Sequence, residues 1–94
     1  MTETQLEIAK ICDDIKELLL YKNLKYGNSA LEPIRVFSCA NNTEQLLVRI
    51  DDKLNRIKHG ENILYDDEDV IQDLIGYLVL LKISLNKASK ENEL

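Results

Sequence analysis

The fold class follows from the stretch TEQLLVRIDDKLNRIKHG, residues 43–60, which has the pattern of one amphipathic helix between two stop signals. A polar residue, Asn42 or Thr43, is a candidate N-cap, and Gly60 is a candidate for the closing position. The spacing predicts a helix over residues 43–59. Its apolar stripe recurs at intervals of three and four residues and comprises Leu47, Ile50, Leu54 and Ile57.

Three cations recur at the same spacing on another side of this helix, at Arg49, Lys53 and Arg56, with Asp52 beside them. Arginine suits phosphate, because its planar fork donates to two oxygens at once. One interpretation is therefore that this face forms a wall of a site for an anionic ligand. The alternative is a solvated face on which acids and bases pair one turn apart.

Two further helices are expected, one on each side of this stretch. The last covers residues 67–87, opens with acids, and is apolar on more than one face, which favours cover by another subunit. Residues 88–94 are expected to form a frayed polar tail. The first helix covers residues 3–24, with Thr2 or Thr4 as its N-cap and an inward stripe of Ile8, Ile11, Ile15, Leu18 and Leu19.

Residues 25–42 lack a regular period and are expected to form an irregular plug segment. Gly27 and Pro33 break the pattern, and residues 34–37 are expected to form a helical turn that plugs the core. The whole chain, residues 1–94, is thus predicted to be a single all-α domain of three main helices. We expect it to form a helical bundle within a homo-oligomer, a dimer or larger.

The composition limits the classes of function. A net charge of −5 and a pI of about 4.8 argue against duplex nucleic acid or an anionic membrane as the main partner. No signal peptide or membrane span is recognised, so a cytoplasmic protein is expected. Cys12 falls in an apolar pattern and is expected to be buried, and one histidine makes a zinc site improbable. No nucleophile, base and acid set and no phosphate-binding glycine loop occurs, so no catalytic residue is assigned.

A second candidate group lies where the first helix runs into the irregular segment. It offers ammonium groups, an aromatic ring, a glycine and two small polar side chains, which can stack a base and donate to phosphate or ribose. The alternative is an ordinary helix C-cap followed by a polar turn. The members of this group are Lys22, Lys25, Tyr26, Gly27, Asn28 and Ser29.

A third group is acidic. Asp69 and Asp73 lie one turn apart on the last helix, where two carboxylates repel unless a cation lies between them. That cation could be Mg²⁺, the one cofactor that the sequence suggests, or equally Arg49 or Lys53. For Asp69 a role at the helix N-terminus is sufficient by itself. A further acidic pair, Asp14 and Glu17, lies on the first helix.

Three sequence motifs in this order resemble the nucleotide-modification-associated domain type 1 family of phages and bacteria. They are E-x-x-x-x-K-N-x-x-Y-G-N-S at residues 17–29, L-x-V-R-I-x-D-K-x-x-R at 46–56, and D-x-x-x-D-x-x-x-Y at 69–77. The third motif adds Tyr77 to the candidate ligand residues. The resemblance implies a nucleotide as the class of ligand, and it does not imply a reaction.

The chain also resembles, more distantly, the MazG-like all-α nucleotide pyrophosphohydrolases, which hold Mg²⁺ against a triphosphate with paired acids. Asp14 with Glu17 and Asp69 with Asp73 would be those pairs in this sequence. The second pair departs from the family's spacing, with four residues in place of three, and the first has aspartate where glutamate is expected. Efficient hydrolysis is therefore not expected.

The leading hypothesis is a small nucleotide-binding protein. Tyr26 would contact base or ribose, a basic group of Arg49, Lys53 and Arg56 would hold phosphate, and Glu17, Asp52 and Asp73 would orient these or hold a metal. In a phage, such binding without turnover could sequester a nucleotide signal of a bacterial defence system. The alternatives are a Mg²⁺-dependent MazG-like pyrophosphohydrolase and a non-catalytic accessory subunit for DNA or nucleotide modification.

Overall fold

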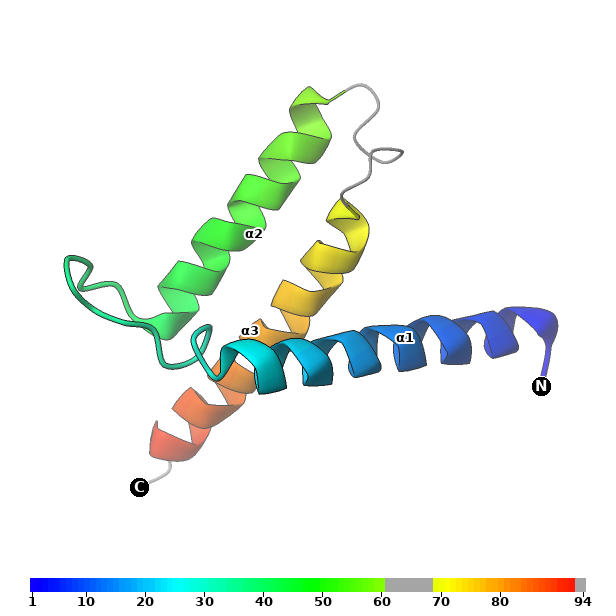
Figure 1. Ribbon diagram of the computed structural model, residues 1–94, viewed down its shortest axis with the longest axis horizontal. Helices are drawn as coiled ribbons and strands as arrows, with labels where there is room; N and C mark the ends of the chain where they lie inside the picture. Colours follow the sequence, from blue (N-terminus) through cyan, green and yellow to red (C-terminus); the bar gives the residue numbers. More distant parts are fainter. Residues whose placement is uncertain (61–68, 93–94) are drawn as a thin grey trace.

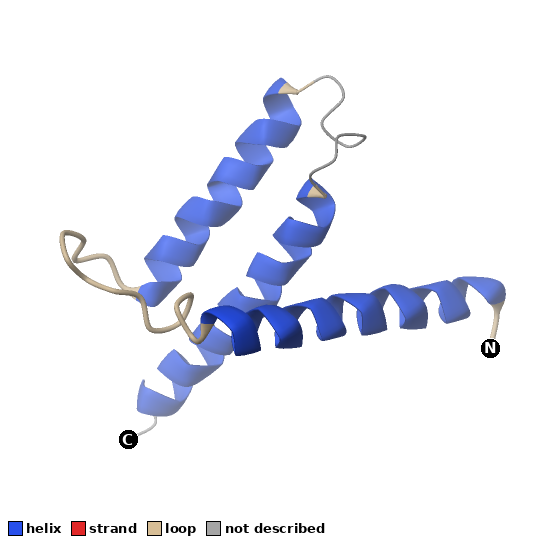
Figure 2. Cartoon of the chain, viewed as in Figure 1, coloured by secondary structure: helices blue, strands red, loops and turns tan. Residues whose placement is uncertain are grey.

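The computed structural model describes residues 1–60 and 69–92, and within these residues it contains three helices and no strand (Figures 1 and 2). The helices are α1 (Glu3–Tyr26), α2 (Asn42–His59) and α3 (Val70–Asn92). Helices α2 and α3 lie side by side and run antiparallel, whereas α1 crosses α3 and its N-terminal half extends away from both (Figure 1). The predicted all-α class with three main helices is confirmed.

Helix α1 begins with a reciprocal cap. The Thr2 hydroxyl accepts a hydrogen bond from the Gln5 amide at 3.1 Å, and the Gln5 side chain accepts one from the Thr2 amide at 2.9 Å. The helix ends at Gly27, whose φ of 70° lies in the region that favours glycine. Of the two candidate caps, Thr2 is the one used, and α1 runs two residues further than the expected end at residue 24.

The N-cap of α2 is Asn41, so the expected cap is wrong by one residue for Asn42 and by two for Thr43. The Asn41 side chain accepts from the Glu44 amide at 2.8 Å. Asn42 is the first helical residue, and its side chain serves the preceding loop: it accepts from Arg35 Nη2 at 2.8 Å and donates to the Leu31 carbonyl. Local propensity does not distinguish the two adjacent asparagines as N-caps. The contacts of the Asn42 side chain with the loop leave Asn41 to cap the helix.

The loop between α1 and α2 enters the core through Leu31, which is 7% exposed. The expected helical turn at residues 34–37 is wrong: these residues form no helix, and Ile34 and Phe37 are 84% and 97% exposed. Pro33 fixes its own φ and disfavours a helical conformation in the residue before it, which agrees with the irregular backbone of this loop.

The side of α2 that packs on α3 is rotated from the predicted stripe. Leu46 and Ile50 are buried on this side, whereas the predicted stripe members Leu47 and Leu54 are exposed. The side chain of Lys53, one turn after Ile50, is only 14% exposed. A charged residue at an inward position breaks the apolar period, and this explains the error. The buried apolar side chains of the described residues are Ile15, Leu31, Leu46, Ile50 and Val70.

The C-terminal end of α3 and the N-terminal half of α1 also differ from the sequence-based expectations. Helix α3 continues to Asn92, so residues 88–92 are helical where a frayed tail was expected. Residues 93–94 and the predicted helix start at 67 lie outside the described residues. On α1, Cys12 is exposed and not buried, and Ile8 and Ile11 are 56% and 55% exposed. Their exposure follows from geometry, because α1 extends beyond α3 at this end (Figure 1).

Candidate functional site

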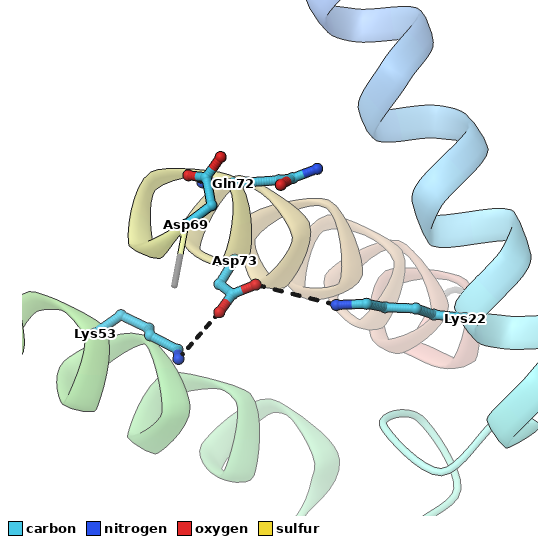
Figure 3. A network of polar contacts seen from close by, with 5 residues as sticks. All are labelled: Lys22, Lys53, Asp69, Gln72 and Asp73. Carbon is cyan, nitrogen blue, oxygen red and sulfur yellow. Dashed lines mark hydrogen bonds and ion pairs between the residues drawn. The ribbon is translucent and has the colours of Figure 1, made fainter. Parts of the chain in front are cut away.

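The site is built around Asp73 of α3, whose carboxylate lies between two lysines from the other two helices (Figure 3). Lys53 Nζ of α2 lies 3.2 Å from Asp73 Oδ2, and Lys22 Nζ of α1 lies 4.0 Å from Asp73 Oδ1. The Asp73 side chain is 26% exposed, so solvent screens these pairs only partly. The carboxylate therefore links all three helices at one point.

Local sequence explains why α1 comes this close to α3. Gly76 of α3 is buried, and a Cβ atom added there would lie 3.1 Å from Leu19 Cδ2 of α1. The missing side chain lets the two helices approach at this crossing. Lys22 is one turn after Leu19 on α1, and Asp73 is one turn before Gly76 on α3. The glycine crossing thus brings the two charges together.

Arg49 and Tyr77 extend the site from the same pair of helices, α2 and α3. The guanidinium carbon of Arg49 lies 5.9 Å from the centre of the Tyr77 ring, within the range of a cation–π contact. These two residues lie in the walls of two cavities, of about 460 and 440 Å³. We call the two cavities together the Arg49 cleft.

The Arg49 cleft collects most of the predicted ligand residues. The larger cavity has an apolar part formed by Ile15, Leu18, Leu19 and Leu80, and its polar wall comprises Lys22, Tyr26, Ser29, Arg49, Gln72, Asp73 and Tyr77. The second cavity is lined by Arg49, Asp52, Lys53, Asn55, Arg56 and Tyr77. Four cationic side chains face two carboxylates in these walls, although the whole chain carries a net charge of −5.

Three predicted residues of the loop group lie outside the cleft walls. Lys25 places its ammonium 5.2 Å from the Tyr26 ring centre and 5.9 Å from that of Tyr21. Gly27 ends α1. The Asn28 carbonyl accepts from the amides of Leu31 and Glu32, and its side chain accepts from Asn23 Nδ2 at 3.3 Å. These contacts are those of a helix end and turn, which is the alternative interpretation of this group.

The structure does not bring together the three expected metal ligands, Glu17, Asp69 and Asp73. Asp69 caps α3, because its side chain accepts from the Gln72 amide at 2.8 Å, and Glu17 is exposed and lines neither cavity. Within residues 1–60 and 69–92, no group of three or more histidine, cysteine or acidic residues is placed to hold a metal ion. Both oxygens of Asp73 face lysines, so the donor set as it stands does not fit Mg²⁺.

Gln72 and Gly76 were missed by reasoning from the sequence, although both help to form the site. Gln72 carried a weak signal, because it lies one residue before Asp73 inside the third motif. An isolated glycine within an apolar helix is a signal of close packing, and it could have located the crossing of α1.

Comparisons with known proteins add no assignment. Compared with models of protein families, with curated proteins and with solved structures, the chain matches none. In the described part of the chain, no helix has the length and apolar character needed to cross a membrane.

Proposed function

We propose that the protein binds a small nucleotide or nucleotide-derived molecule in the Arg49 cleft. The observation that carries this proposal is the convergence of Lys22, Arg49 and Lys53, from α1 and α2, beside two tyrosines in one set of cavities. Cavities of about 440 and 460 Å³ fall within the range that holds small ligands. Phosphate needs cations, and a base needs an aromatic face or an apolar floor.

Each part of the cleft has a distinct task in this proposal. Arg49 and Arg56 present planar forks to phosphate oxygens. Tyr26 and Tyr77, with the apolar floor, provide surfaces for the base, and Ser29 offers a hydroxyl for ribose. Asp73 lies between the ammonium groups of Lys22 and Lys53 and positions both in the walls of the cleft.

The contacts of Asp73 favour binding of a nucleotide without turnover over its hydrolysis. A pyrophosphohydrolase of the MazG-like type needs carboxylates that hold Mg²⁺, whereas this carboxylate faces two lysines. We therefore propose sequestration of a nucleotide, which in a phage would remove a signal from a bacterial defence system. A homo-oligomer located in the cytoplasm is part of this proposal. A non-catalytic accessory subunit would use the same basic walls to dock a partner.

A panel of nucleotides in a thermal-shift assay, with and without Mg²⁺, tests the proposal. We expect at least one phosphorylated nucleoside to raise the melting temperature by several degrees without Mg²⁺, since ligand that binds only the folded state stabilises it. The matching nucleosides without phosphate serve as controls and should give smaller shifts. Stabilisation only in the presence of Mg²⁺ would favour the pyrophosphohydrolase, and no stabilisation by any nucleotide would favour the accessory subunit.

A further inference from the structure

A polar cavity lies apart from the Arg49 cleft, between the loop that precedes α2 and the C-terminal part of α3. Its volume is about 350 Å³, and it shares no lining residue with either cavity of the cleft. Arg35 of the loop and Lys87 of α3 contribute two cations to its walls, and none of its lining residues is acidic. We call it the Arg35 cavity. The rest of its polar wall consists of Asn41, Asn42, Thr43 and Ser84.

Contacts within the loop fix the guanidinium group of Arg35 in this wall. Its Nη1 donates to the Ala40 carbonyl, and its Nη2 donates to Asn42 Oδ1 at 2.8 Å. These contacts engage only part of the guanidinium donors, so other N–H groups remain for a ligand. Both acceptors are neutral, and neither Arg35 nor Lys87 forms an ion pair with a carboxylate of the described residues. The described residues therefore leave the positive charge of the cavity without a counter-charge.

A pair of hydroxyls in the same wall carries one proton more than the pair can use. The Thr43 and Ser84 hydroxyls are 2.9 Å apart, and either can be the donor. Whichever one donates, the other still carries a proton, and neither hydroxyl has a further acceptor among the described residues. Ser84 is only 7% exposed, and an O–H group without an acceptor is costly at such a buried position. The pair therefore needs an acceptor within the cavity.

The first turn of α2 adds two more donors. Asn41 accepts from the Glu44 amide with its side chain and from the Gln45 amide with its carbonyl. The amides of Asn42 and Thr43, two residues that line the cavity, have no acceptor among the described residues. Amide groups at the start of a helix, together with the helix dipole, attract negative charge. Two cations, a hydroxyl pair and two amides, from the loop, α2 and α3, thus surround one cavity.

We propose that the Arg35 cavity binds the phosphate group of a small molecule, either free phosphate or a phosphate monoester. A carboxylate presents fewer oxygens than a tetrahedral phosphate, which can accept from the guanidinium, the ammonium, the hydroxyl pair and the amides together. The net charge of −5 disfavours a long polyanion and leaves a small ligand as the occupant. The proposal goes beyond nucleotide binding in the Arg49 cleft and does not depend on it, because the two sites share no residue.

Residue-resolved NMR of isotope-labelled protein, in a buffer without phosphate, tests this. We expect inorganic phosphate or glycerol 3-phosphate to shift the amide signals of Asn42 and Thr43 saturably, and chloride at the same ionic strength to leave them in place. The probe with the lower dissociation constant distinguishes free phosphate from a monoester. Lys87→Met should raise that constant about tenfold, since it removes one charged hydrogen bond. Lys82→Met removes an exposed cation of α3 outside the cavity and should not change the constant.

Arg49→Ala separates this site from the cleft. It should leave the phosphate affinity measured at Asn42 and Thr43 unchanged, although we expect it to weaken nucleotide binding. Lys87 is exposed, so its replacement should leave the fold intact, and unchanged amide signals outside the cavity verify this. The proposal is overturned by the absence of a saturable shift at Asn42 and Thr43, by equal constants for the wild type and Lys87→Met, or by a loss of phosphate affinity only in Arg49→Ala. Nucleotide binding in the cleft would stand in the first two cases.

Discussion

Lys53 Nζ lies 3.2 Å from Asp73 Oδ2, and only 14% of the lysine side chain is exposed. The cation thus faces the neighbouring helix, although Arg49 and Arg56 on the same side of α2 are exposed. The basic face predicted from the sequence thus comprises a largely buried lysine that pairs with Asp73 and two exposed arginines, and all three line the second cavity.

Replacement of Lys53 by methionine should lower the free energy of unfolding by about 1–2 kcal/mol, because the stem still packs but Asp73 loses its nearer partner. Lys58→Met is the matched control, since it removes an exposed cation from the same helix and should change stability by less than about 0.5 kcal/mol. Urea denaturation measures both. Equal stabilities of the two variants would show that the Lys53–Asp73 pair does not stabilise the fold.

The hydroxyls of Thr43 and Ser84, 2.9 Å apart, join the start of α2 to α3, and Ser84 is 7% exposed. Either Thr43→Val or Ser84→Ala should cost about 1 kcal/mol, because each leaves the other hydroxyl without this partner. The double variant should cost less than the two together, since no hydroxyl is then left unpaired. Urea denaturation of the wild type, the two single variants and the double variant gives the coupling free energy between the two hydroxyls. Strictly additive losses of stability would show that the hydroxyls do not interact.

Gly76→Ala should change the free energy of unfolding by less than about 1 kcal/mol, because the gain in helix propensity offsets contact with a flexible end of Leu19. Gly76→Leu should push α1 away from α3, cost about 1–3 kcal/mol, and weaken nucleotide binding. Denaturation of both variants measures their stability, and titration with nucleotide measures their affinity. A Gly76→Leu variant as stable and as tight-binding as the wild type would mean that the crossing does not position the site.

Turnover of nucleoside triphosphates in the presence of Mg²⁺ should be absent or slow, because the Asp73 oxygens face lysines. A pyrophosphate-release assay over the common triphosphates checks this. Rapid release that requires Mg²⁺ and disappears in Asp73→Ala would identify an enzyme and reject the sequestration proposal.

The helices were predictable because their periods and caps are local properties of the sequence. Mg²⁺, Arg49 and Lys53 were left open as the cation beside the acidic pair, and in the structure Lys53 lies at Asp73, whereas Asp69 caps α3. The contact between Lys22 and Asp73 was not foreseen, since it depends on where α1 crosses α3, and the isolated Gly76 that marks this crossing was not used as a signal. The burial of Leu46 in place of Leu47 was not predictable either, because Lys53 at an inward position interrupts the apolar period of α2.

Arg49 tests the central claim most directly, because its guanidinium lies beside Tyr77 and in the walls of both cavities. Calorimetric titration would compare the wild type, Arg49→Ala and the control Lys58→Ala, using the nucleotide that stabilises the protein most. We predict a loss of affinity of roughly ten- to a hundredfold for Arg49→Ala, the equivalent of one charged hydrogen bond to phosphate, and wild-type affinity for Lys58→Ala. Equal affinities for all three proteins would contradict nucleotide binding in the Arg49 cleft.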